Sequence, residues 1–282
     1  MSASFQPLVS IITPVYNGER FLDSLIQSVQ EQDYPNFEHI IIDDGSTDGG
    51  ATINLLKNYS HLRWWTRPNR GQYATMNEGL EAAKGEFICF VSADDKLEKG
   101  AISCVMNYMK SHLPCDCVYG YTAYMFEDGK PYLPIVPFRG LPFRSYRYFF
   151  HVQHCSLYIR RKVILEKNIC FNEQLHYVGD YDWLIRLFEN HLNIEFIQAT
   201  LSWVRVHEGQ VSIQNRKRMR TELFRVAKFH NTNPCLFWLS LILNTWAFNL
   251  YKLFYTLKYR GLVGGKGLIL NWFHRRITLQ SK

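Results

Sequence analysis

The sequence predicts an α/β protein in which a central, mixed and mainly parallel sheet is flanked by helices, followed by a C-terminal helical extension. Short apolar runs alternate with amphipathic segments through the first half, which is the pattern of βαβ units. The 282 residues, 47% of them hydrophobic, can bury a sizeable core. Polar residues directly follow three of the apolar runs, where sheets of this kind bind their ligands.

The first half of the chain contains four predicted strands and two predicted helices. Residues 8–14 form the first strand, and the following helix, 20–32, places Phe21, Leu25, Ile26 and Val29 on one face. The next elements in order are strands at 37–43 and 62–67, a helix at 73–83 and a strand at 86–91.

The second half is less regular. Residues 121–147 are rich in Pro, Tyr, Phe and Gly and predict a hairpin followed by irregular loops. Strands are expected at 156–159 and 201–206, with a helix at 181–189 between them. We therefore expect one domain over residues 1–230 and an extension over residues 231–282. Within the domain, a nucleotide-binding half is expected at about 1–120 and an acceptor-binding half at about 121–230.

The extension carries the positive charge of the chain. The formal net charge is +7, and residues 234–282 contain Lys and Arg but no Asp or Glu. This placement favours an anionic membrane surface and argues against a nucleic-acid-binding face. Residues 235–251 are uncharged, rich in Leu and Trp and just below spanning length, which predicts an interfacial helix. A core helix or a dimer contact is the alternative.

The cysteines and the N-terminus indicate a reducing compartment. The seven cysteines form no CxxC pair and no zinc-like spacing. Residues 1–7 lack the basic start and apolar run of a secretory signal. We therefore expect a cytoplasmic location, peripheral at the inner face of the cell membrane.

Two pairs of aspartates follow predicted strands. Asp43 and Asp44 can accept hydrogen bonds from a nucleobase and a ribose, although Asp-Gly-Ser also caps ordinary turns. Asp94 and Asp95 repel each other unless a cation such as Mg²⁺ or Mn²⁺ lies between them. The alternative for this second pair is an N-cap of the next helix.

Other candidate residues lie farther along the chain. Asp180 at a predicted helix start suits a general base, because the helix dipole keeps it ionised, or it serves as an N-cap. Arg205 and His207 end a strand within reach of a diphosphate or a metal, although a single His is usually structural. Asn69 to Gly71 offers a helix N-terminus for an anion, or an ordinary turn.

Six segments, taken in order, resemble the family 2 glycosyltransferases, and the likeness covers about residues 8–212. The segments are Ile12-Thr13-Pro14-Val15-Tyr16-Asn17, Ile42-Asp43-Asp44-Gly45-Ser46-Thr47-Asp48, Asn69-Arg70-Gly71, Ser92-Ala93-Asp94-Asp95, Gly179-Asp180-Tyr181-Asp182 and Arg205-Val206-His207. The resemblance implies the GT-A fold, with a Rossmann-like central sheet, and a reaction that inverts the anomeric carbon in a single displacement.

The resemblance also implies roles for individual residues, with Asp180 as the catalytic base. Asp94, Asp95 and His207 would hold a divalent metal, Mn²⁺ or Mg²⁺. The diphosphate or the acceptor would be contacted by Arg205, His154 and Asp182. The nucleotide would be bound by Thr13, Pro14, Tyr16, Asp43, Asp44, Asn69, Gly71, Ala93 and Asp94.

The chain departs from the family pattern at two positions. Members often carry a carboxylate or Asn where this chain has Ser92, and Glu where it has Gly179. Ser92 leaves the Asp-x-Asp motif incomplete, although Asp94 and Asp95 still offer two ligands for a metal.

The expected function is sugar transfer from a nucleoside-diphosphate sugar, with UDP favoured, to a hydroxyl of a saccharide or lipid-linked acceptor. The expected setting is biosynthesis of cell-surface polysaccharide, with no nucleic-acid partner. A nucleotidyltransferase and a non-catalytic scaffold that binds sugar nucleotides at the membrane are the alternatives.

Overall fold

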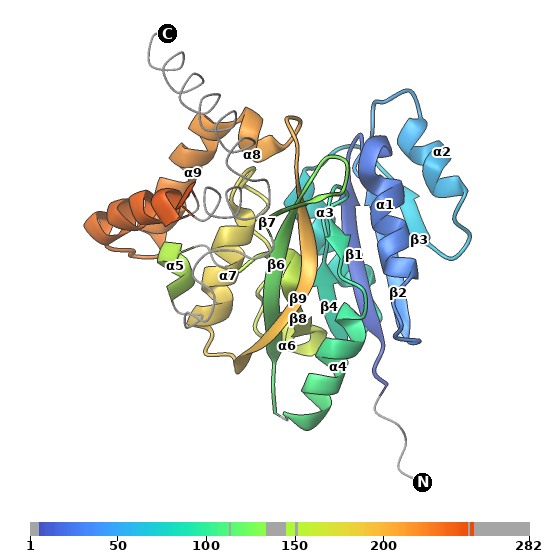
Figure 1. Ribbon diagram of the computed structural model, residues 1–282, viewed down its shortest axis with the longest axis horizontal. Helices are drawn as coiled ribbons and strands as arrows, with labels where there is room; N and C mark the ends of the chain where they lie inside the picture. Colours follow the sequence, from blue (N-terminus) through green and yellow to red (C-terminus); the bar gives the residue numbers. More distant parts are fainter. Residues whose placement is uncertain (1–5, 113, 134–144, 150–151, 248, 251–282) are drawn as a thin grey trace, which may run out of the picture.

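A mixed sheet runs through the centre of the protein, and helices cover both of its faces (Figure 1). The computed structural model describes residues 6–112, 114–133, 145–149, 152–247 and 249–250. Within these ranges the sheet has nine strands. They are β1 (Val9–Val15), β2 (Phe37–Asp43), β3 (Arg63–Thr66), β4 (Phe87–Phe90), β5 (Lys96–Leu97), β6 (Cys117–Phe126), β7 (Pro131–Leu133), β8 (Leu157–Arg160) and β9 (Ile194–Val206).

The strand order is β3-β2-β1-β4-β8-β6-β9-β5, with β7 paired to β6. The first four strands in this order are parallel. Beyond them, β8 is antiparallel to β4 and β6, whereas β9 is parallel to β6 and antiparallel to β5. The predicted mixed sheet is confirmed, but its parallel pairs are concentrated in the first half of the chain.

The two faces of the sheet bury different sets of helices, because side chains alternate along each strand. Ile11 and Ile41 belong to the cluster that includes α1, α2 and α4, while Ile12 and Ile42 belong to the cluster that includes α3, α6, α7 and α9. The helices are α1 (Glu19–Gln30), α2 (Ala51–Lys57), α3 (Gln72–Ala82), α4 (Ala101–Ser111), α5 (Tyr146–Phe149), α6 (Arg161–Glu166), α7 (Gly179–Glu189), α8 (Val211–Gln214) and α9 (Arg216–Phe229), together with a short 3-10 helix, η2 (His154–Ser156).

Two predicted elements differ in extent or contact. The strand expected at 201–206 is the end of the longer β9, and β6 with β7 forms the hairpin expected after residue 121, where the amide of Phe126 donates to the carbonyl of Lys130. Leu22, rather than Phe21, completes the buried face of α1. Residues 134–144 of the predicted loops lie outside the described residues.

The extension begins as a helix that packs on α7 and α9. We define the C-terminal helix as residues 234–247 and 249–250. Its Phe237 is buried, and the ring of Phe237 contacts those of Tyr181 and Phe224. None of the helices within the described ranges is long and apolar enough to cross a membrane. The basic residues from Lys252 onward lie outside the described residues.

Candidate active site

The loops that follow β1 and β2 are joined to each other. The amide of Asp44 donates to the carbonyl of Val15 over 2.8 Å, and the amide of Asn17 donates to Ser46 Oγ over 2.8 Å. The ring of Tyr16 is half exposed beside them. Because β1 and β2 are parallel, their polar ends form one rim at the carboxyl edge of the sheet.

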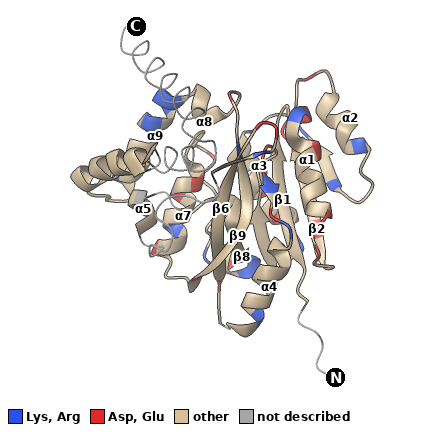
Figure 2. Cartoon of the chain, viewed as in Figure 1, with Lys and Arg blue, Asp and Glu red and all other residues tan. Residues whose placement is uncertain are grey.

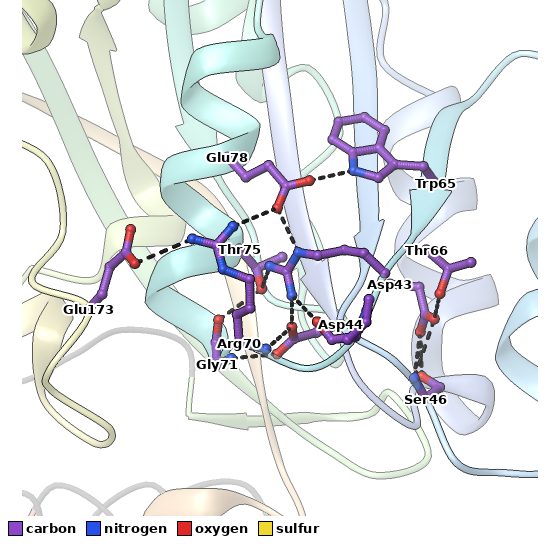
Figure 3. A network of polar contacts seen from close by, with 12 residues as sticks. Asp43, Asp44, Ser46, Trp65, Thr66, Arg70, Gly71, Thr75, Glu78 and Glu173 are labelled. Carbon is purple, nitrogen blue, oxygen red and sulfur yellow. Dashed lines mark hydrogen bonds and ion pairs between the residues drawn. The ribbon is translucent and has the colours of Figure 1, made fainter.

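Asp43 and Asp44 are both buried and hydrogen-bonded within this rim (Figure 3). Asp43 accepts hydrogen bonds from Ser46 and, over 2.6 Å, from Thr66 Oγ1. Asp44 accepts the amides of Arg70 over 2.8 Å and Gly71 over 2.9 Å. Asp44 therefore holds the loop that leads into α3.

Sequence reasoning missed Arg67, which connects this loop to α3. Arg67 forms an ion pair with Asp44, donates through Nε to Glu78 over 2.6 Å and contacts Thr75 over 2.9 Å. Burial alone would lower the pKa of Arg67, but the hydrogen bonds and charges of Glu78 and Asp44 raise it. The sequence could have indicated this role, because Arg67 directly follows β3 and the neighbouring strand β2 ends at Asp43, which Asp44 follows.

The Asp94–Asp95 pair divides between two environments. Oδ2 of Asp94 lies 3.0 Å from Nε2 of His207, and the Asp94 side chain is partly exposed. The carboxyl of Asp95 is buried and accepts the amide of Arg205 over 3.1 Å. Burial and the negative charge of Asp94 raise the pKa of Asp95 well above its usual value. The N-cap alternative fails, because α4 begins at Ala101 with Gly100 as its N-cap.

The fit of these residues to a divalent metal is partial. The described part of the chain has no group of three or more His, Cys, Asp or Glu side chains that would hold a metal ion. Asp94 and His207 supply one carboxylate and one imidazole, donors that suit Mn²⁺, and a diphosphate and water can complete the shell. Asp94 and His207 therefore suit a cation that is also coordinated by a bound diphosphate. Asp95 is not part of this set of donors.

The structure argues against Arg205 as a diphosphate ligand. Its side chain is buried and donates from Nε to the carbonyl of Asp94 over 2.9 Å. It also donates to the carbonyl of Glu127 over 2.7 Å and to Ser24 Oγ over 3.1 Å. Burial lowers its pKa despite the nearby Asp95 and Asp94. Arg205 instead fixes the end of β9 against the loop that carries Asp94.

Asp180 is the second residue of α7 rather than its N-cap. Val178 occupies the N-cap position, and the helix has no side-chain cap. Oδ1 of Asp180 accepts the amide of Tyr181 over 2.9 Å, and the side chain is 31% exposed. Asp180 therefore lies in the first turn of α7 with its carboxylate partly open to solvent.

His154 links Asp180 to the loop after β4. Its Nε2 lies 3.3 Å from Ser92 Oγ, and its Nδ1 lies 3.8 Å from Oδ2 of Asp180. Ser92 and Asp94 belong to the same loop, and Asp94 in turn contacts His207. Asp180 therefore lies on the same side of the sheet as Asp94.

Tyr73 on α3 packs against Gly179, the residue before Asp180. A Cβ built on Gly179 would lie 2.6 Å from Cε2 of Tyr73. Burial and the charge of Asp180 raise the pKa of Tyr73 well above its usual value, so the phenol stays neutral. The ring of Tyr73 thus occupies the place of a side chain at position 179, which explains why glycine stands there.

The remaining residues predicted to contact the nucleotide differ in how accessible they are. Thr13 and Pro14 are buried within β1, and Thr13 Oγ1 lies 3.1 Å from Nε2 of His39, so the side chain of Thr13 faces the core. Asn69 is exposed, Gly71 is the N-cap of α3, and Ala93 lies beside Gly18. Of these five residues, Thr13 is the one whose contacts argue against the predicted role.

The structure also places Asp182 away from the group. Its buried carboxyl lies 2.9 Å from His230 Nε2 and accepts Nε of Arg186 over 2.9 Å. Since Asp180 and Asp182 lie two residues apart on a helix, they face different directions. Asp182 ties α7 to the end of α9, and these contacts argue against a role at the acceptor.

We expect the Asp182→Asn variant to lose stability at neutral pH, by about 3 kcal/mol for a broken buried ion pair. Burial by itself raises the pKa of Asp182, but His230 and Arg186 outweigh it, so the net pKa is lowered. A lowered pKa stabilises the folded state above the unfolded pKa of about 3.9, and this stabilisation is lost as the pH falls through the folded pKa.

Denaturant unfolding of both proteins between pH 7 and pH 3 measures this effect. The difference in free energy of unfolding should shrink as the pH falls below about 4. Asp128→Asn is the matched control, because Asp128 also has a lowered pKa but pairs with Lys130 at the exposed surface. A difference that stays constant down to pH 3 would contradict the assignment.

Comparisons with known proteins identify similar sequences and similar structures. A family model described as glycosyl transferase family 2 matches residues 10–166. The putative teichuronic acid biosynthesis glycosyltransferase TuaG of Bacillus subtilis is 33% identical over 135 residues, which cover 45% of this chain and 52% of the relative. The chain thus spans about half the length of that curated relative.

Two solved structures share the fold. TarS of S. aureus (residues 1–349), in complex with UDP-GlcNAc, superposes with a TM-score of 0.61 at 23% identity, over 72% of this chain and 59% of that one. The mannosyltransferase PcManGT of Pyrobaculum calidifontis, in complex with GDP-Man and Mn²⁺, gives 0.56 at 16% identity, over 95% and 80%. These likenesses confirm the GT-A fold.

Proposed function

The chain belongs to glycosyl transferase family 2, and from this we propose that it transfers a sugar, with inversion, from a nucleoside-diphosphate sugar to a hydroxyl group of an acceptor. The observation that carries the proposal is a set of neighbouring side chains: Asp180 lies near His154, and His154 contacts Ser92. The loop that carries Ser92 also carries Asp94, which contacts His207. This arrangement supports the proposal that Asp180 is the base and that Asp94 and His207 contribute to the diphosphate site.

The proposed reaction is a single displacement at the anomeric carbon. Asp180 accepts the proton of the acceptor hydroxyl as its oxygen forms the new bond to that carbon. The bond from the anomeric carbon to the diphosphate breaks, and its electron pair leaves with the diphosphate. Asp94 and His207 would hold a divalent cation, Mn²⁺ or Mg²⁺, which when bound offsets the charge that develops on the leaving group.

The donor is proposed to lie along the rim formed by the ends of β1 and β2. The exposed ring of Tyr16 offers a surface on which a base can stack, and the amides and side chains around Asp43 and Asp44 fix its shape. The structural neighbours were solved with a uridine nucleotide in one case and a guanosine nucleotide in the other. We favour a UDP-sugar and test both.

Product analysis tests this function directly. The purified chain is incubated with UDP- and GDP-sugars, Mn²⁺ or Mg²⁺, and saccharide or lipid-linked acceptors. We expect release of the nucleoside diphosphate and formation of a glycosylated acceptor. Release of pyrophosphate would instead indicate a nucleotidyltransferase. Thermal stabilisation by the sugar nucleotides without any turnover would indicate a binding scaffold.

We further propose that the protein attaches peripherally to the inner face of the cell membrane and acts in assembly of cell-surface polysaccharide. The C-terminal helix exposes an apolar stripe, and all Lys and Arg residues of α9 are exposed. Figure 2 marks the Lys and Arg positions of α9 in blue. The single acidic residue of α9, Glu222, is buried. The stripe is formed by Leu236, Leu239, Ile242, Leu243, Trp246 and Leu250.

An apolar stripe beside a basic helix matches the chemistry of an anionic lipid surface, with acyl chains under acidic headgroups. The guanidinium of Arg220 on α9 lies 6.0 Å from the ring centroid of Trp238 on the C-terminal helix. Basic and aromatic side chains of the two helices are therefore neighbours. A surface of this kind would bring the site to a lipid-linked acceptor. The name of the relative TuaG, which refers to teichuronic acid biosynthesis, agrees with such a setting.

Removing the stripe should weaken membrane binding without loss of folding. We expect the Leu239→Ser/Trp246→Ser double variant to bind phosphatidylglycerol vesicles about tenfold or more weakly, because each buried apolar side chain contributes about 1.5–3 kcal/mol. Vesicle sedimentation at low and high salt measures this, and salt should weaken binding of the wild type. Leu165→Ser, an exposed leucine on α6, is the control.

Two results would count against the membrane proposal. The first is a wild-type protein that does not bind these vesicles at low salt. The second is a dimer in solution that dissociates in the double variant, which would identify the stripe as a contact between two copies of the chain.

A further inference from the structure

His154 is buried, yet one of its ring nitrogens has no hydrogen-bond partner. The residue is 8% exposed, and its Nδ1 is fully enclosed without a hydrogen-bond partner. A buried polar nitrogen without a hydrogen-bond partner destabilises the folded state, so it calls for an explanation. Oδ2 of Asp180 lies 3.8 Å from this nitrogen.

The other ring nitrogen is held by a residue that departs from the family pattern. Nε2 of His154 lies 3.3 Å from the hydroxyl of Ser92. A hydroxyl donates a hydrogen bond as readily as it accepts one. When Ser92 donates to Nε2, the proton of the neutral imidazole lies on Nδ1 and points at Asp180.

We propose that Ser92 and His154 are positioning residues that hold Asp180 in the orientation of the base. The inference rests on the proposed function. Catalytic hydrogen bonds are often long before substrate binds and shorten in the reactive complex. A shift of less than 1 Å would bring Nδ1 and Oδ2 within hydrogen-bond distance, since N–H···O bonds measure about 2.9 Å.

The geometry also explains why Ser92 is compatible with activity. A carboxylate at position 92 would place a negative charge beside Nε2 of His154. This charge would draw the ring proton to Nε2, away from Asp180. A hydroxyl leaves the proton on Nδ1. Ser92 therefore departs from the Asp-x-Asp pattern, and in this proposal its hydroxyl helps to orient the base.

Two substitutions of His154 separate the two ring nitrogens. In Asn, the side-chain amide group overlies Nδ1 and keeps a donor toward Asp180, whereas in Gln it overlies Nε2 and keeps the contact with Ser92. We expect kcat to fall about tenfold to thirtyfold in His154→Gln and within about threefold in His154→Asn, as is usual when a supporting residue is removed. KM for the donor and the affinity for UDP with Mn²⁺ should not change.

The measurement uses the full chain and the sugar nucleotide that the wild type turns over fastest, with thermal unfolding as a check on folding. A double variant with Asp180→Asn should be no slower than Asp180→Asn alone, because His154 acts through that carboxylate. Equal losses in the Asn and Gln variants, an additive double variant or a changed affinity for UDP would overturn the proposal. A wild type without turnover, or an Asp180→Asn variant that retains it, would instead remove the proposed function or the assigned base.

Discussion

The Asp180→Asn variant is expected to lose nearly all sugar transfer while it still binds the donor. Proton abstraction by a positioned carboxylate contributes about a hundredfold to ten-thousandfold to rate, and we expect a fall in kcat of about a thousandfold. The affinity for UDP with Mn²⁺ should change little, because the contacts of Asp180 are with Tyr181 and His154 rather than with the rim of β1 and β2.

The comparison needs a substitution of the same kind far from the site. Asp33 is exposed and is not part of the candidate site. Its carboxylate, between α1 and α4, accepts a hydrogen bond from Ser103. Asp33→Asn should keep the kcat of the wild type. A loss of UDP affinity in Asp180→Asn equal to its loss of kcat would indicate that Asp180 binds the donor and is not the base.

Strands β1 and β2 followed from the sequence because most of their residues are buried on both faces of the sheet. Residues 9–15 and 40–43 are buried, so they appear as largely apolar runs, and each is followed by polar residues at the same edge. β9 was recognised only at its end, because much of Ile194–Thr200 is partly exposed and carries no clear alternation. Helix α9 was missed, since most of its residues are polar and exposed.

For the site, the sequence indicated which segments meet but not which way each side chain points. Asp94 and Asp95 are adjacent, yet one faces His207 and the other is buried beneath Arg205. Asp182 was grouped with Asp180 by motif alone, although the contacts of α9 decide its direction. These orientations depend on residues more than 40 positions away in sequence, such as His230, and no local pattern encodes them.

The adjacent aspartates offer the sharpest test of the metal site. We expect Asp94→Asn to weaken the Mn²⁺-dependent binding of UDP about a hundredfold, the upper part of the range for disturbed metal sites. His207→Ala should act in the same direction, since its imidazole lies 3.0 Å from Asp94. Titration calorimetry of UDP with Mn²⁺, and again with a chelator in place of the metal, measures the effect independently of turnover.

Asp95→Asn should have a far smaller effect than Asp94→Asn, although the two residues are neighbours. The raised pKa of Asp95 means that its carboxyl favours the neutral form, which an amide resembles in shape and charge. The amide oxygen also keeps an acceptor for the backbone N–H of Arg205. His61→Ala, an exposed histidine before β3, controls for loss of an imidazole. Equal losses in the two aspartate variants would show that Asp95 is a metal ligand after all, and unchanged binding in Asp94→Asn would remove the metal from this pair.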